Sequence, residues 1–203
     1  MKIALVGATG NVGSRILKEA LNRGHQVTAI VRNTERLPHH PDLVAKKGDI
    51  TRGAAAAALL AGHDAVISSV RFKDVGAQPV IDAVRAAGVK RLLVVGGAGS
   101  LEVAPGVQLL DTPQFPAAYK PEASAGREFL NTLRSAQDLE WTFLSPSALL
   151  IPGERTGKFR IGGDQLLKDA AGESKISMED LAVAMIDELE KPQHVRQRFT
   201  AGY

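Results

Sequence analysis

The stretch KIALVGATGNVGSRILKEAL, residues 2–21, decides the fold of this chain. Residues 2–6 form an apolar run without alternation, which is typical of a strand buried on both faces of a parallel sheet. Glycines follow at positions 7, 10 and 13, and behind them apolar residues recur at the spacing of one helix face: Val12, Ile16, Leu17, Ala20 and Leu21. The stretch therefore predicts a strand that turns through glycines directly into an amphipathic helix.

The turn between this strand and this helix has the properties of a phosphate site. The unpaired N–H groups and the positive dipole end of the helix point at one spot. Glycine is needed there because a Cβ would hold a pyrophosphate away from the backbone, or the helix away from the strand. The pattern is related to G-x-G-x-x-G, with its first spacing one residue longer. We predict a dinucleotide site at this turn, with an incidental turn as the alternative.

Composition limits the other classes of function. The 203 residues are enough for one well-cored domain, 1–203, and 44% hydrophobic with 23% charged residues is ordinary for globular proteins. The net charge is only +3, and the lysines and arginines are scattered along the chain, so no nucleic-acid partner is expected. The chain has no cysteine and its histidines lack ligand spacing, so no metal is expected. Without a membrane-length apolar run or a signal-peptide pattern, we expect a cytoplasmic protein that does not enter a membrane.

Strand and helix patterns alternate along the rest of the chain. Strands are expected at 26–31, 43–47, 65–70, 91–95 and 141–144, and helices at 54–60, 78–87 and 122–136. Ser177 should cap a last helix, with Asp180 at the capping-box position. Residues 156–169 suggest a hairpin, and residues 198–203 suggest an edge strand. The order predicts an α/β fold: a single-domain, Rossmann-type, doubly wound, mainly parallel sheet with helices on both faces.

Several of these segments together resemble the atypical short-chain dehydrogenase/reductase superfamily. The nearest branch is that of small NAD(P)H-binding proteins described as NADH-flavin reductases, similar to flavin/biliverdin-IXβ reductases. The segments are GATGNVG at 7–13, VRN at 31–33, GDI at 48–50, VISSV at 66–70, LLVVGGAGS at 92–100 and WTFLSP at 141–146. The resemblance covers essentially the whole chain, and it implies an NAD(P) cofactor without identifying a substrate.

The resemblance also implies which residues hold the cofactor. Those expected around the pyrophosphate are Gly7, Thr9, Gly10, Asn11 and Val12. Those expected against the adenine are Asp49 and Ile50, and those near the adenosine ribose are Ser69 and Val70. Those expected beside the nicotinamide are Gly97, Pro146 and Ser147. Asp49 could instead be a plain turn residue, and Pro146 ends a strand in any interpretation.

Arg32 bears on the choice between the two nicotinamide cofactors. NAD-specific sites place an acidic residue about 20 residues after the glycines, where it binds the ribose 2′-hydroxyl. Here Arg32 directly follows the second strand, and the first carboxylate is Glu35. A guanidinium can form a forked contact with a 2′-phosphate. The sequence therefore predicts a preference for NADP(H), with NAD(H) possible, and a solvated loop arginine is the alternative.

The catalytic residues of the superfamily are only partly present. Many members carry Tyr-x-x-x-Lys, but here Tyr119 is followed four residues later by Ala123. Ser100 could be the superfamily's serine after the fifth strand, or it could simply end a glycine turn. Ser100 and Tyr119 are therefore the candidate catalytic residues. A flavin or quinone takes hydride into a conjugated ring and can take its proton from water, so it does not need the missing lysine.

These points favour an NAD(P)H-dependent oxidoreductase that passes hydride to a flavin- or quinone-like conjugated acceptor. The acceptor site is expected at about 100–121 and 147–176, and the protein is expected to be a monomer or homodimer. One alternative is an NAD(P)-dependent carbonyl reductase or epimerase that uses Tyr119. The other is a non-catalytic NAD(P)-binding redox sensor, since a fold alone does not fix function.

Overall fold

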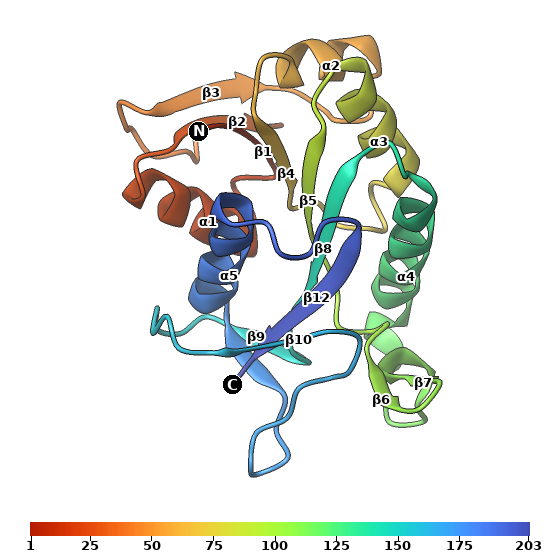
Figure 1. Ribbon diagram of the computed structural model, residues 1–203. Helices are drawn as coiled ribbons and strands as arrows, with labels where there is room; N and C mark the ends of the chain where they lie inside the picture. The colour runs from red at the N-terminus through yellow and green to blue at the C-terminus, as the bar shows by residue number, and fades with distance from the viewer.

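An eight-stranded sheet with the order β10-β12-β8-β5-β4-β1-β2-β3 forms the centre of the molecule. The structure, a computed structural model, describes residues 1–203 (Figure 1). The strands are β1 (Lys2–Val6), β2 (Gln26–Val31), β3 (Leu43–Lys47), β4 (Ala65–Ser68), β5 (Arg91–Val95), β8 (Glu140–Ser145), β10 (Arg160–Gly162) and β12 (Gln197–Gly202). Every neighbouring pair is parallel except β10 and β12, which are antiparallel. The predicted mainly parallel sheet is confirmed.

Helices cover both faces of this sheet. Helices α1 (Asn11–Asn22) and α5 (Met178–Glu190) pack together on one face (Figure 1). Helices α2 (Ala54–Leu60), α3 (Ala77–Ala86) and α4 (Lys120–Ser135) cover the other. The doubly wound Rossmann-type fold is therefore confirmed. None of the helices combines the length and the apolar composition that a membrane-spanning helix requires.

The two hydrophobic cores explain the unalternating strand β1. Ile3 and Leu5 lie in the core beneath α1 and α5, whereas Ala4 and Val6 lie in the core beneath α2, α3 and α4. Successive side chains of a strand point to opposite faces, so a strand covered on both sides needs apolar residues at every position. This is why the apolar run of residues 2–6 indicates a central strand.

The expectations for the C-terminal third are partly wrong. β12 is not an edge strand, because β10 pairs with it on its outer side, from Arg160↔Gly202 to Gly162↔Thr200. Residues 156–169 do not form a hairpin, because β10 pairs with β12 and Gln165 instead bridges to Glu102. Without β10, the side of β12 that faces away from β8 would present unpaired backbone N–H and C=O groups. β10 forms hydrogen bonds with these groups.

Four short strands lie outside the main sheet. β9 (Leu149–Ile151) pairs in parallel with β11 (Lys175–Ser177), and β6 (Glu102–Ala104) pairs antiparallel with β7 (Val107–Gln108). Two 3-10 turns, Leu109–Asp111 and Ala117–Tyr119, then lead into α4. These pieces build the two long segments that follow β5 and β8 (Figure 1).

The start of α5 confirms half of the predicted capping box. The Ser177 hydroxyl accepts a hydrogen bond from the Asp180 N–H at 2.9 Å, as an N-cap serine does. The Asp180 carboxylate does not return to Ser177. It accepts hydrogen bonds at 2.8 Å from the Gly157 N–H and from the Tyr203 hydroxyl. The helix start therefore also holds the 152–158 loop and the C-terminal residue.

Candidate functional site

The carboxyl ends of the parallel strands bring the predicted cofactor residues to one edge of the sheet. β1 lies between β2 and β4, with Val6 beside Ile30 on one side and Ser68 on the other. The strand order reverses at this point, because the chain continues from β1 outward to β3 and then crosses back to β4. In open α/β sheets, ligands bind in the crevice at such a switch point.

The three glycines of the first turn are required for different reasons. Gly7 has a φ of +84°, and a Cβ on it would lie 2.2 Å from the Ser69 carbonyl oxygen. A Cβ on Gly13 would lie 2.1 Å from the Gly7 carbonyl oxygen, so α1 could not pack on the turn. Gly10 is exposed, and its Cβ would meet only the Gly7 oxygen, at 3.4 Å. The protein's own packing therefore needs Gly7 and Gly13, whereas Gly10 borders open space.

The N-terminus of α1 is open to an anion. Gly10 is its N-cap and no side chain caps it. The N–H groups of Asn11, Val12 and Gly13 donate no hydrogen bond within the protein, whereas Ser14 N–H donates to the Gly10 carbonyl at 2.9 Å. Unpaired N–H groups at the positive end of a helix fit a phosphate. Of the other predicted pyrophosphate residues, Thr9 is half-buried in this turn.

Arg32 and Asp49 follow the two neighbouring strands on the outer side of β1. Arg32 is exposed, comes directly after β2, and makes no hydrogen bond or ion pair within the protein. The Asp49 carboxylate accepts hydrogen bonds from the Thr51 N–H at 2.9 Å and the Thr51 hydroxyl at 2.7 Å. These bonds, with smaller effects of the charges on Arg52 and Arg32, lower the pKa of Asp49. The turn thus keeps Asp49 ionised at neutral pH.

The remaining predicted cofactor residues lie along the same edge. Ile50 is 4% exposed and belongs to the core beneath α2, α3 and α4. The Ser69 N–H donates to the Val6 carbonyl at 2.9 Å, which holds the end of β4 against the first turn. Val70 is half-buried beside the same core, Gly97 is half-buried two residues beyond β5, and buried Pro146 directly follows β8.

The structure does not join the two catalytic candidates. Tyr119 is 66% exposed at the start of α4, and its hydroxyl makes no hydrogen bond. Ser100 is buried, and its hydroxyl accepts a hydrogen bond from Arg198 at 3.2 Å. Ala123 faces the loop after β5, because a Cβ on Gly99 would lie 2.8 Å from the Ala123 Cβ. The methyl group of Ala123, four residues after Tyr119 in α4, thus packs against the loop after β5.

The two predicted acceptor segments, 100–121 and 147–176, contact one another. The Glu102 N–H donates to the Asp164 carbonyl at 2.8 Å, and the Leu166 N–H donates to the Glu102 carbonyl at 2.9 Å. Sequence analysis missed Arg198, which contacts both segments from β12. The only sequence signal for a functional Arg198 is that a charged residue stands next to the apolar Phe199 in a segment expected to form a strand.

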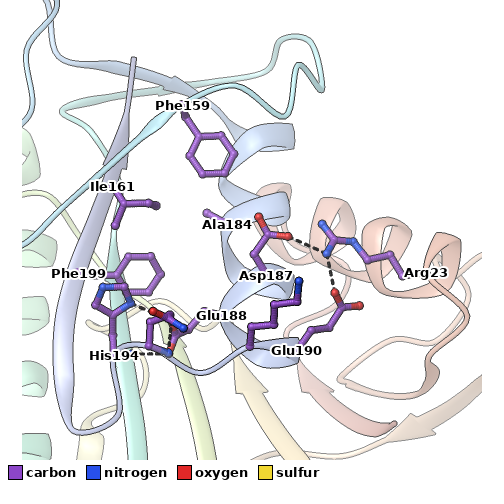
Figure 2. Close-up of a pocket in the computed structure, with 11 residues that line it drawn as sticks. Arg23, Phe159, Ile161, Ala184, Asp187, Glu188, Glu190, His194 and Phe199 are labelled. Atoms are coloured by element: carbon purple, nitrogen blue, oxygen red, sulfur yellow. Dashed lines mark hydrogen bonds and ion pairs between the residues drawn. The ribbon is translucent and has the colours of Figure 1, made fainter.

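A separate groove lies at the far end of α5 (Figure 2). It has a volume of about 540 Å³ between the last turns of α5 and strands β10 and β12, and Phe159, Ile161 and Phe199 supply its apolar wall. The buried Glu188 at its base contacts Arg91 Nη2 at 3.0 Å and His194 Nδ1 at 2.8 Å. No sequence pattern pointed to this groove. It lies where β12 begins, and the carboxyl ends of the strands lie at the opposite edge of the sheet.

The fold and the open helix terminus are those of a Rossmann-type dinucleotide-binding protein, and the relatives described below make the class an NAD(P)-binding protein of the oxidoreductase type. Residues 7–192 match the model of the NAD(P)H-binding family, and the chain belongs to that family. The resemblance to the atypical short-chain dehydrogenase/reductase superfamily is thereby confirmed.

Three solved structures are similar over the whole chain. A putative exported protein from Burkholderia pseudomallei is 51% identical, with a TM-score of 0.92 and coverage of 100% of both chains. A putative epimerase from Bacteroides thetaiotaomicron is 46% identical, with a TM-score of 0.95, and the match covers 100% of this chain and 96% of that one. A putative NADH-flavin reductase from Streptococcus pneumoniae TIGR4 is 36% identical, with a TM-score of 0.88, and the match covers 100% of this chain and 99% of that one.

Proposed function

We propose that this protein is an NADPH-dependent reductase that passes hydride to a flavin- or quinone-like conjugated acceptor. The observation that carries the proposal is Ala123, which packs against Gly99 at the position where a Tyr-x-x-x-Lys enzyme has its lysine. A site without this lysine is poorly suited to reduce an acceptor that must be protonated by a side chain, whereas a conjugated ring can take its proton from water. The name of the S. pneumoniae relative supports the same chemistry.

The turn after β1 supplies the proposed phosphate site. The N–H groups of Asn11, Val12 and Gly13 would donate to the pyrophosphate, with the α1 dipole adding a favourable field. Thr9 and Gly10 border the same space. Asp49 and Ile50 would lie against the adenine, and Ser69 and Val70 would lie near the ribose. Gly97 and Pro146 would flank the nicotinamide, which supplies the hydride when bound.

The preference for NADP(H) would come from Arg32. Its guanidinium is exposed and makes no hydrogen bond within the protein, so it is available to a 2′-phosphate. NAD(H) lacks that phosphate and would bind without the contact. The Asp49 charge nearby limits the net attraction, because it partly offsets the guanidinium.

The acceptor would lie between the segments 100–121 and 147–176 of this one domain. These segments follow β5 and β8, next to the proposed nicotinamide residues. Their main roles would be to stack against the flat acceptor and to orient it for hydride transfer. Ser100 could donate a hydrogen bond to the acceptor, and Tyr119 could close the entrance from the start of α4.

A carbonyl reductase or epimerase that uses Tyr119 is the second candidate. It is favoured by the name of the B. thetaiotaomicron relative and by the position of Tyr119 at the start of α4. In that reaction the Tyr119 hydroxyl would protonate the substrate oxygen. A redox sensor would instead bind the cofactor without turnover.

The experiment is an NADPH and NADH oxidation assay with FMN, a quinone and dichlorophenolindophenol, run beside a panel of hydroxylated carbonyl compounds. The proposal expects turnover with the conjugated acceptors and none with the carbonyls. Turnover only with carbonyls would favour the second candidate. Tight NADPH binding without any turnover would favour the sensor, and either result would overturn the proposal.

We also propose that the protein acts in the cytoplasm as a monomer or homodimer, with the small-molecule acceptor as its partner. Reduced nicotinamide cofactors are maintained inside the cell, and this supports the location. The relative named as an exported protein stands against it. Cell fractionation and sedimentation analysis of the full chain test both statements.

A further inference from the structure

A buried arginine lies beneath the two proposed acceptor segments. Arg198, near the start of β12, is 8% exposed. Its neighbour Phe199 points into the core beneath α1 and α5, so Arg198 points to the opposite face of the sheet. There its guanidinium contacts Ser100 in the loop after β5, Ser145 at the end of β8 and Asp164 in the loop after β10.

These contacts use all three guanidinium nitrogens. Nε donates to an Asp164 carboxylate oxygen at 2.8 Å, and Nη2 lies 2.7 Å from the same oxygen. Nη1 donates to the Ser100 hydroxyl at 3.2 Å and to the Ser145 hydroxyl at 3.4 Å, and Nη2 donates to the Ser100 carbonyl at 3.3 Å. A planar guanidinium can reach three directions at once, whereas a lysine ammonium is a single point.

Asp164 connects this arginine to both segments. The Asp164 carbonyl accepts a hydrogen bond from the Glu102 N–H at 2.8 Å. Two residues further on, the Leu166 N–H donates to the Glu102 carbonyl at 2.9 Å. Glu102 begins β6, and the residues after β10 run beside it (Figure 1). The ion pair between Arg198 and Asp164 therefore holds the two segments against each other and against the strand ends.

The serine contacts fix the direction of two hydroxyl groups. The Ser100 and Ser145 hydroxyls each accept from Arg198, and neither donates a hydrogen bond within the protein. A hydroxyl has one hydrogen to donate, and a cation on its acceptor side directs that hydrogen away from the cation. Ser100 follows the loop that carries the proposed nicotinamide residue Gly97.

We propose that Arg198 is a positioning residue for the acceptor half of the site. It orients the Ser100 hydroxyl as a donor and, through Asp164, holds the 163–167 loop on Glu102. The proposal rests on the proposed function, because the acceptor is the molecule that these segments would receive. It makes acceptor use, and not cofactor binding, depend on the guanidinium of Arg198.

The test compares Arg198→Lys and Asp164→Asn with the wild-type protein. Three quantities are measured: NADPH Kd by fluorescence titration, KM for FMN, and amide hydrogen exchange of residues 100–112 and 160–169. We expect the KM for FMN to rise at least tenfold in Arg198→Lys while the NADPH Kd stays within twofold. Exchange at Glu102 and Leu166 should be at least tenfold faster in both variants. If Arg198→Lys does not fold, Asp164→Asn decides, because the Asp164 side chain is 58% exposed.

Asp138→Asn is the matched control. Asp138 forms an ion pair with Arg85 at 2.6 Å, and its side chain is 53% exposed, so the same substitution is made in a similar pair that lies before the start of β8, away from the carboxyl ends of the strands. All three quantities should stay within twofold of wild type. An unchanged exchange rate at residues 102 and 166, or an unchanged KM with faster exchange, would overturn the positioning role.

The exchange measurement separates this proposal from the proposed function. If the wild-type protein reduces no flavin or quinone with NADPH, the proposed function fails. The faster exchange in Arg198→Lys, or its absence, then still decides whether Arg198 holds the two segments together.

Discussion

Gly10→Val should abolish NADPH binding in a protein that stays folded. Gly10 has a φ of −73° and a ψ of 169°, which is extended backbone that valine adopts readily. Its Cβ would meet one protein atom, the Gly7 carbonyl oxygen at 3.4 Å. Valine is a poorer N-cap than glycine, so we expect a loss of about 1 kcal/mol in the free energy of unfolding. For a chain of this size, that lowers Tm by about 2–4 °C.

The effect on binding should be much larger. The valine side chain would fill the space in front of the unpaired N–H groups of Asn11, Val12 and Gly13. A hydrogen bond to a charged group contributes roughly 1.5–3 kcal/mol, so losing two of them costs about 3–6 kcal/mol. At 1.4 kcal/mol for each tenfold change, NADPH should bind at least a hundredfold more weakly.

Two matched variants isolate the cause. Gly76 caps α3 with a φ of −74° and a ψ of 172°, and nothing lies within 4 Å of its Cβ position. Gly76→Val should therefore lower Tm by a similar amount, about 2–4 °C, because valine is again the poorer N-cap, and it should leave the NADPH affinity near wild type. Gly13→Ala should instead unfold the protein, because its Cβ would lie 2.1 Å from the Gly7 oxygen. Calorimetry that gives Gly10→Val an NADPH Kd within threefold of wild type, with native circular dichroism, would refute the phosphate site.

Three further substitutions test the cofactor preference, the acid and the electrostatics. Arg32→Asp should remove a preference for NADPH over NADH of roughly 10–100-fold, measured as a ratio of Kd values, with little effect on NADH; equal wild-type affinities would contradict this role. Tyr119→Phe should slow flavin or quinone reduction less than about tenfold, and a collapse of kcat at unchanged NADPH affinity would instead identify an essential acid. Hydrogen bonds from Arg155, at 2.7 Å, and from Arg23 hold the pKa of Glu19 below its usual value. The folded-state pKa is thus below the unfolded one, so the stabilisation is present at neutral pH and disappears as the pH falls from about 4 through the folded-state pKa. Glu19→Gln should cost about 1–2 kcal/mol of unfolding free energy at pH 7, because it removes the negative charge that Arg155 and Arg23 bind, while these arginine side chains, 53% and 20% exposed, stay partly hydrated. The difference from wild type in urea titrations should shrink below about pH 4. A pH-independent difference would show that the loss is one of packing.

The sequence fixes the first unit of the fold through local rules. An apolar run without alternation, a glycine turn and a helical apolar face together specify β1, the turn and α1, because each signal depends on neighbours a few residues apart. The rule that parallel strands end at one edge of the sheet selects the loops that carry the proposed cofactor residues, and the family resemblance implies which residues of those loops they are. The roles of those residues stay predictions until the variants above are measured.

Only the tertiary structure decided the pairing of the last strands and the partners of Ser100. β10 joins β12 through pairs such as Arg160↔Gly202, and Arg198 reaches Ser100 across the sheet. Neither the pairing of β10 with β12 nor the contact of Arg198 with Ser100 can be predicted from a short window of sequence, because packing of the whole sheet brings these segments together. The sequence by itself determined the doubly wound core and the open helix terminus, which arise from local periodicity. The tertiary structure determined how the buried Arg198 guanidinium joins segments 100–121 and 147–176, because a buried charge needs polar partners and only the folded chain brings Ser100 and Asp164 next to it.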